Sequence, residues 1–236
     1  PDKSKLSKRQ GDVAVEDYRA KGYLKEALVN FVAFLGWNPG DEREIFTIEE
    51  LIKEFSLERV GKAGAVFNIE KLDWFQEQHL RAKPEAEALG MLKEELKKSK
   101  FADKNFDDGY LLKVIQAMRE RAAFVRDFVE KSPYFFEPPK EYDESVVKKR
   151  WKPETSGQLL TLLEEFSKLN NPTKEDFEWA LNGTAGQFNI GAGELIHPLR
   201  LSLTGVAIGP GVYDIAEVLG KDETIKRIKK AIEKIK

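Results

Sequence analysis

Residues 5–12, with the sequence KLSKRQGD, hold the side chains best suited to phosphate chemistry in this chain. Three cations and Ser7 lie within five residues, and Gly11 gives the backbone the freedom of a mobile loop. Ammonium groups placed in this way can neutralise the charge that builds on the leaving oxygens when a tri- or pyrophosphate is attacked at phosphorus. A basic stretch of this composition is also typical of a flexible chain end or a solvated loop. The segment therefore predicts a polyphosphate-binding loop, with a solvated loop as the alternative.

The elements that must position this loop are helices, because apolar side chains recur at helical spacing along most of the chain. Thr47 with Glu50 forms a capping-box pattern, Asn68 and Thr173 are further N-cap candidates, and Gly36 is expected to end a helix in a left-handed cap. We expect helices over residues 24–35, 48–55, 68–81, from 84 onward, 109–130, from 156 onward, from 173 onward, 194–204, 212–219 and from 222 to the end. Leu51, Ile52 and Phe55 are expected to face inward, and Ser156 is expected to cap the helix that follows it.

Two intervals are predicted to interrupt the helices. Residues 82–84 form a short break, and the prolines and charged run of residues 132–153 are typical of a linker. Glycines at 183, 186, 191 and 193 predict a turn, and so does the run Gly209-Pro210-Gly211. We find no alternating pattern long enough for a useful strand, and the predicted class is mostly α.

Composition excludes several classes of protein. Hydrophobic residues make up 41% and charged residues 34% of the 236 residues, which excludes collagen-like and fully disordered chains. No apolar run is long enough to span a membrane. The absence of cysteine excludes disulfides, thiol catalysis and cysteine-ligated zinc within these residues, and two distant histidines predict no metal site.

The net charge of −2 hides local bias. Residues 41–58 carry a balance of −5 and residues 221–236 a balance of +4. The basic helix with Lys226, Arg227, Lys229 and Lys230 could approach RNA phosphates, and a solvated face explains the same pattern equally well.

The order K-x-S-K-R followed by G-D resembles the KMSKS signature of class I aminoacyl-tRNA synthetases, with Leu6 in place of the methionine. Residues 22–75, from GYLKEALVNF to KLDWF, closely resemble bacterial glutamyl-tRNA synthetases just after that loop. Residues 197–228, beginning HPLRLSLTGVAIGPGVYD, resemble the same family's anticodon-binding region. Both blocks follow the family's order, so we identify the chain as a member, whereas residues 84–168 match only loosely.

This resemblance implies a stem-contact helical domain with the KMSKS loop at residues 1–81, followed by two helical anticodon-binding domains at 82–150 and 151–236. It implies a ligase that activates glutamate with ATP and Mg²⁺ and transfers it to the 3′ end of its tRNA in the cytoplasm, with no membrane or DNA partner. The sequence starts at Pro1 and contains no HIGH signature, so we expect the downstream half of a longer enzyme, inactive alone.

The resemblance also implies residue roles. Lys8 is expected to contact ATP and stabilise pyrophosphate, with Lys5 and Ser7 as helpers in the same loop. Arg121 is expected to read the third anticodon base, with an exposed helix arginine paired to Glu120 as the alternative. Arginine suits base reading because its planar fork presents paired donors to base edges.

Arg200 is expected to be another anticodon contact, and an arginine at the edge of the core is its alternative. The turn at residues 207–212, which includes Pro210 and Val212, could lie against the bases or only reverse the chain. The tryptophans are expected in the core, and His79 and His197 are interpreted as packing or surface residues.

Two other functions remain open from the sequence. One is a stand-alone helical RNA-binding module, which would have no reason to carry KLSKRQGD. The other is a helical scaffold that binds another protein and has no affinity for tRNA.

Overall fold

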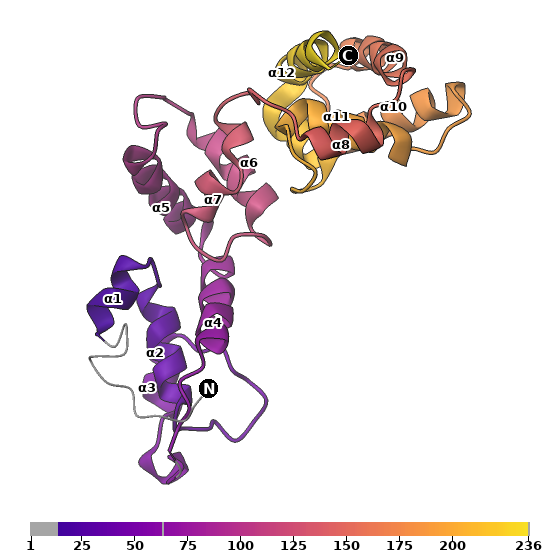
Figure 1. Cartoon of the computed structure of the whole chain (residues 1–236). Coiled ribbons are helices and arrows are strands. Elements are labelled where there is room, and N and C mark those ends of the chain that lie inside the picture. Colours follow the sequence, from indigo (N-terminus) through magenta and orange to yellow (C-terminus); the bar gives the residue numbers. More distant parts are fainter. Residues whose placement is uncertain (1–13, 63, 236) are drawn as a thin grey trace. The chain divides into compact units, whose positions relative to one another are not determined.

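The computed structural model describes residues 14–62 and 64–235, and within them regular structure is helical apart from one isolated bridge between Trp37 and Val60. The prediction of a mostly α fold is therefore confirmed (Figure 1). No helix of these ranges is both long and apolar enough to cross a bilayer. In chain order, the helices are α1 (Val15–Ala20), α2 (Lys25–Phe34), α3 (Ile48–Glu54), the 3₁₀ turn η1 (Leu57–Arg59), α4 (Ile69–Arg81), α5 (Glu85–Lys98), α6 (Asp108–Met118), α7 (Asp127–Glu130), the 3₁₀ turn η2 (Pro133–Phe135), α8 (Glu144–Arg150), α9 (Thr155–Lys168), α10 (Lys174–Gln187), α11 (Gly193–Thr204) and α12 (Val212–Lys234).

Contacts between residues divide the chain into two compact units. The first unit comprises the described residues up to Ala102 together with Arg119–Phe128, and the second comprises Asp103–Met118 and the chain from Val129 onward. The division into three domains at 1–81, 82–150 and 151–236 stays a prediction.

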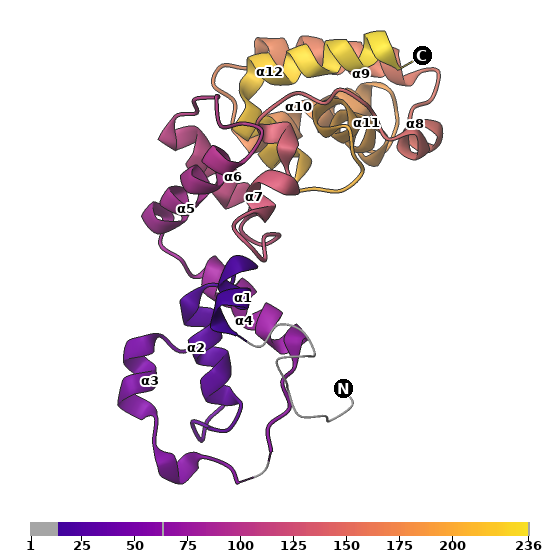
Figure 2. The same ribbon diagram turned by 60° about the vertical axis from the view of Figure 1, so that its left-hand side comes forward.

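The first unit is built around α2 and α4, which lie side by side in both views (Figures 1 and 2). Leu72 and Phe75 of α4 are fully buried, and the ring of Phe31 from α2 lies 6.1 Å from that of Phe75. Asn68 caps α4 as predicted, because its Oδ1 accepts from the Glu70 N–H at 2.9 Å. The capping box of Thr47 and Glu50 at the start of α3 is confirmed as well.

A polar group inside this unit ties three segments together. The Oδ1 of Asn30 accepts from the Phe46 N–H at 2.9 Å, and its Nδ2 donates to the Glu44 carbonyl at 3.0 Å. Since that oxygen is an acceptor, Nε2 of His79 must be the donor in the 3.0 Å bond that joins α4 to Asn30. His79 is thus a satisfied packing residue, as interpreted from the sequence.

Three expectations for the first unit were wrong. Gly36 does not adopt a left-handed φ, because α2 ends one residue earlier at a C-cap, Leu35, in the right-handed region. Ile52 and Phe55 do not face the core with Leu51, since they are 77% and 43% exposed.

The predicted long helix over 109–130 is interrupted. It stops at Met118, and α7 begins only at Asp127. The Asp127 carboxylate accepts from the N–H groups of Ala123 and Phe124 at 2.8 and 3.0 Å, which opens a new helix instead of continuing the old one.

The second unit is a bundle in which α9, α10 and α11 pack against α12 (Figure 2). The rings of Phe166 and Phe177, both fully buried, lie 4.9 Å apart between α9 and α10. Thr173 caps α10 as predicted. Gly220 has φ 76° inside α12, so the predicted break between the last two helices is present as a kink.

Other expectations for this unit were wrong. The interval 132–153 is not merely a linker, because it contains η2 and α8, and Tyr134, Phe135 and Phe136 in it are buried. Ser156 lies inside α9, whose N-cap is Glu154.

Two further expectations differ in α10. Gly183 and Gly186 are helical residues of α10 rather than parts of a turn. Trp179, expected in the core, is 74% exposed.

Candidate nucleic-acid interface

The predicted phosphate-binding residues Lys5, Ser7 and Lys8 lie outside the described residues, so the described site is the predicted anticodon contact region. Its residues fall in two places. Arg200, Pro210 and Val212 come together at one end of α11 in the second unit, whereas Arg121 belongs to the first unit.

The end of α11 is shaped by Gly205. This residue adopts φ 78°, and its N–H donates to the Leu201 carbonyl at 2.8 Å. A Cβ at this position would lie 2.5 Å from the carbonyl oxygen of Glu141, so only glycine fits. The side chain of Thr204 then links the helix to the turn, donating to the Arg200 carbonyl at 2.8 Å and accepting from the Val206 N–H at 3.2 Å.

Arg200 lies directly beside the turn that follows. Its Nη1 donates to the Pro210 carbonyl at 2.6 Å, and the side chain is half-buried. A Cβ on Gly209 would come 3.3 Å from that Nη1, so the glycine permits the guanidinium to lie close against the backbone. The arginine is therefore held at the turn rather than buried in apolar packing.

The tip of the turn is exposed and apolar, whereas its end is buried. Val206 and Ile208 are 42% and 79% exposed. Pro210 is buried, and Val212, at 3% exposure, begins α12. Pro210 and Val212 thus form the buried end of the turn. Their contact with anticodon bases stays a prediction.

Ile208 was missed in the sequence analysis. A large apolar residue at a loop tip flanked by Gly205 and Gly209 is the pattern that could have drawn attention to it, because a solvated tip normally carries polar residues.

Arg121 lies in the turn between α6 and α7, outside any helix, and is exposed. Its expected partner Glu120 is bonded elsewhere, to Nη1 of Arg81 at 3.0 Å. Within residues 14–62 and 64–235 no ion pair to Arg121 is formed. The helix placement was wrong, but the side chain is accessible to a ligand.

Arg227, from the basic helix, is not an exposed cation. It is 4% exposed, and its Nη1 donates to the carbonyls of Tyr134 and Leu203, both at 2.7 Å. Its Nε donates to Glu223 at 2.8 Å. This arginine holds η2, α11 and α12 together. Because its guanidinium is buried and bonded within the protein, Arg227 is no longer a candidate phosphate contact.

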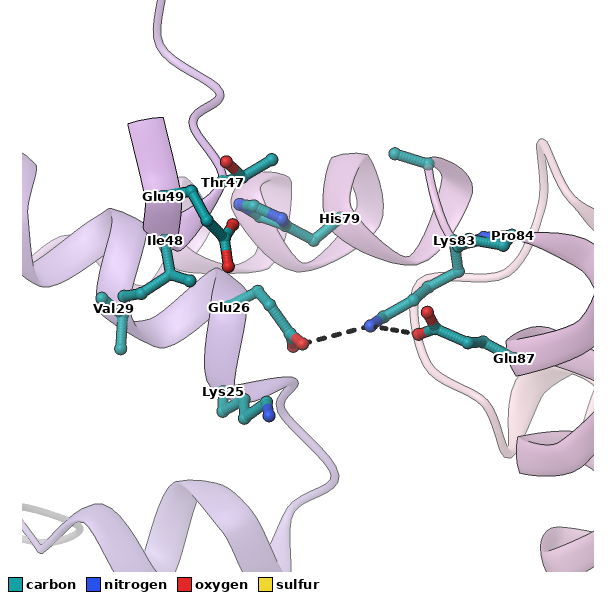
Figure 3. Close-up of a pocket in the computed structure, with 11 residues that line it drawn as sticks. Lys25, Glu26, Val29, Thr47, Ile48, Glu49, His79, Lys83, Pro84 and Glu87 are labelled. Atoms are coloured by element: carbon teal, nitrogen blue, oxygen red, sulfur yellow. Dashed lines mark hydrogen bonds and ion pairs between the residues drawn. The ribbon is translucent and has the colours of Figure 1, made fainter. Parts of the chain in front are cut away.

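A charged group in the first unit lies beside a cavity of about 470 Å³, where Lys83 Nζ bonds Glu26 at 3.1 Å and Glu87 at 2.8 Å (Figure 3). Burial opposes charge on Lys83, but the hydrogen bonds to Glu87 and Glu26 outweigh it and raise the lysine's pKa. The three charges satisfy one another. No group of His, Asp and Glu in the described part of the chain is arranged to hold a metal ion.

Two family models match this chain. Residues 76–232 match the family model of the anticodon binding domain, and residues 1–74 match that of the catalytic domain of class I tRNA synthetases (E and Q). The chain is 47% identical over 244 residues to the glutamate–tRNA ligase of Chloroherpeton thalassium and 46% identical over 245 residues to that of Prosthecochloris aestuarii.

These alignments include the whole of this chain but only 48% of each relative, so the chain spans about half their length. A crystal structure of a glutamate tRNA ligase from Elizabethkingia meningosepticum, in complex with its amino acid, superposes with a TM-score of 0.90 at 39% identity. That superposition covers 99% of this chain and 49% of the other.

Proposed function

Because this chain belongs to the anticodon-binding domain family and resembles glutamate–tRNA ligases along its whole length, we propose that it is the tRNA-recognising portion of such a ligase. The enzyme activates glutamate with ATP and transfers it to the 3′ end of its tRNA, in the cytoplasm where charged tRNA is used. The observation that carries the proposal is the guanidinium of Arg200, held at an exposed turn inside the segment that matches the anticodon-binding model.

Sequence-specific RNA recognition targets unstacked bases of loops, which are hydrogen-bonded on their edges and packed on flat or apolar surfaces. The turn after α11 offers both kinds of contact. The planar guanidinium of Arg200 supplies hydrogen-bond donors, and the exposed side chain of Ile208 in the following turn supplies an apolar surface. Pro210 and Val212 support this turn, and its glycines allow a base to approach the backbone closely.

Arg121 is the second proposed reader of the anticodon. Its side chain is exposed and forms no ion pair with the described residues, so its guanidinium does not have to break one to bind a base.

Lys5, Ser7 and Lys8 are proposed to bind the phosphates of ATP, which carries Mg²⁺, and Lys8 is proposed to stabilise the pyrophosphate leaving group. The support is the resemblance of their segment to the KMSKS signature, within a region that matches the catalytic-domain model. In the complete ligase, Lys8→Ala is expected to depress adenylate formation with less effect on tRNA affinity. An equal loss in both would contradict the ATP role.

These 236 residues are proposed not to catalyse alone, since the catalytic-domain model matches only residues 1–74 and no HIGH signature is present. Glutamate-dependent exchange between ATP and pyrophosphate tests this directly. We expect none with the purified chain, and robust exchange would contradict the division of labour.

The decisive experiment for the anticodon site compares two transcripts, a glutamate tRNA and the same tRNA with a changed anticodon. Wild-type chain should prefer the first, and Arg200→Ala should reduce that preference by about 10- to 100-fold, because one bidentate contact is worth about 1–3 kcal/mol of base discrimination. Lys168→Ala is the matched control, since it removes one positive charge from an exposed lysine of the same unit that is paired to Glu165. Equal affinity of the wild type for both transcripts would favour a general RNA-binding module, and no affinity for either would favour a protein scaffold.

A further inference from the structure

Helix α8, which lies in the interval predicted as a linker, runs antiparallel to α11. At one end, the N–H of Asp143, the N-cap of α8, donates to the carbonyl of Gly205 after α11, at 2.9 Å. At the other end, Lys152 just after α8 bonds Glu194 in the first turn of α11 at 2.6 Å. These two contacts fix the register, so positions 149 and 150 fall opposite positions 197 and 198.

Apolar packing in the middle of the pair supports the same register. Val146 and Val147 of α8 and the following Trp151 pack against a cluster that includes Leu201 of α11. This contact directs one face of α8 inward. Lys149 and Arg150 are exposed.

The register brings cations of both helices together along what we call the α8–α11 seam, defined by Lys149, Arg150, His197 and Arg200. Burial lowers the pKa of His197, and the positive charges of Arg150, Arg200 and Lys149 lower it further. The three cations are thus close enough to His197 to act on it, although 47 residues separate it from Arg150 in the sequence.

The two lysines that flank Lys149 and Arg150 already have acidic partners. Lys148 lies 3.8 Å from Glu144, and Lys152 is paired with Glu194, so these two lysines have their own partners. Lys149 and Arg150 form no ion pair with any residue that the structure describes. Like charges brought together by folding repel one another, and an anion that binds among them removes this cost.

We propose that the α8–α11 seam binds the sugar–phosphate backbone of the tRNA whose anticodon Arg200 contacts, with Lys149 and Arg150 each neutralising a phosphate. This proposal rests on the proposed function, because Arg200 belongs to both the seam and the anticodon turn. The seam adds affinity and orients the RNA, whereas the turn reads the bases. Lys149 and Arg150 are therefore positioning contacts that carry no sequence preference.

The salt dependence of binding tests this division. Each phosphate contact contributes roughly 0.7 to 0.9 to the slope of log affinity against log salt. The double variant Lys149→Ala/Arg150→Ala should therefore lower the slope measured with the glutamate tRNA transcript by about 1.5. The preference of the protein for the correct anticodon should stay unchanged. Lys168→Ala/Lys174→Ala is the matched control, since it removes two positive charges from exposed lysines of the same unit that are paired to Glu165 and Asp214, and its slope should equal that of the wild type.

Circular dichroism checks that each variant is folded. A second variant, Lys149→Arg/Arg150→Lys, keeps both positive charges and should therefore retain the wild-type slope. An unchanged slope in the alanine variant, or an equal fall in the control, overturns the seam while leaving anticodon recognition intact. A wild-type chain that binds both transcripts equally, or neither of them, overturns the proposed function instead, and the seam inference with it.

Discussion

Replacing Arg227 by methionine should destabilise the second unit without touching the RNA-binding surface. The side chain is 4% exposed and donates three hydrogen bonds, to the carbonyls of Tyr134 and Leu203 and to the carboxylate of Glu223. Methionine fills a similar volume, so the loss comes from the polar contacts rather than from a cavity.

The expected magnitude follows from those contacts. A hydrogen bond to a charged group contributes about 1.5–3 kcal/mol, and breaking a buried ion pair by removing one partner costs about 3–5 kcal/mol. Glu223 is 29% exposed and regains part of its hydration, so the lower end of that range applies. We expect Arg227→Met to lower the free energy of unfolding of the second unit by about 3 kcal/mol.

The assay must separate the two units, because unfolding of a two-unit chain is not one cooperative transition. Hydrogen exchange at increasing urea, followed in peptides from α11 and α12, reports the stability of the second unit, and peptides from α4 report the first. Lys229→Met, on an exposed lysine two positions away, is the control and should change stability by less than about 0.5 kcal/mol. A variant Arg227→Met as stable as the wild type but with lower tRNA affinity would refute the reasoning and return Arg227 to the phosphate contacts.

Helix caps were predictable from the sequence because they are local. Thr47, Asn68 and Thr173 bond backbone groups two or three residues away, so the pattern that encodes each cap lies within a few letters of sequence. Gly183 and Gly186 led to a wrong prediction of a turn because their conformation is decided by packing rather than by local sequence. Glycine in a helix costs about 1 kcal/mol relative to alanine, and burial of side chains elsewhere on α10 outweighs that local preference.

The candidate site was predictable only in part, because its residues depend on contacts between distant segments. Arg200 and the turn after it share one short motif, and the structure places them together. Nothing local distinguishes Arg227 from the exposed Lys229, since only the packing of α12 against η2 and α11 decides which cation is buried. Likewise, Arg150 lies near enough to His197 to lower its pKa only because α8 pairs with α11, and composition alone made α8 resemble a linker.

Three further perturbations test the first unit and the turn. Gly205→Ala should lower the stability of the second unit by about 2 kcal/mol or more, since it combines a left-handed φ with a Cβ 2.5 Å from the Glu141 carbonyl. Hydrogen exchange in peptides from α11 at increasing urea measures this, and unchanged exchange would contradict the geometry. Arg121→Ala should change the free energy of unfolding by less than about 0.5 kcal/mol but lower the affinity for glutamate tRNA in a filter-binding assay. An unaltered affinity would show that Arg121 does not belong to the interface. His79 predicts a pH dependence. Burial chiefly lowers its pKa, against the opposing charge of Glu26, so the unfolded chain takes up the proton first as the pH falls below about 6.5. The stability that neutral His79 contributes is therefore complete above that pH and is lost as the pH falls through the depressed folded-state pKa. Hydrogen exchange in α4 should show this loss in the wild type and a flatter profile in His79→Gln, and identical profiles would show that His79 does not link folding to protonation.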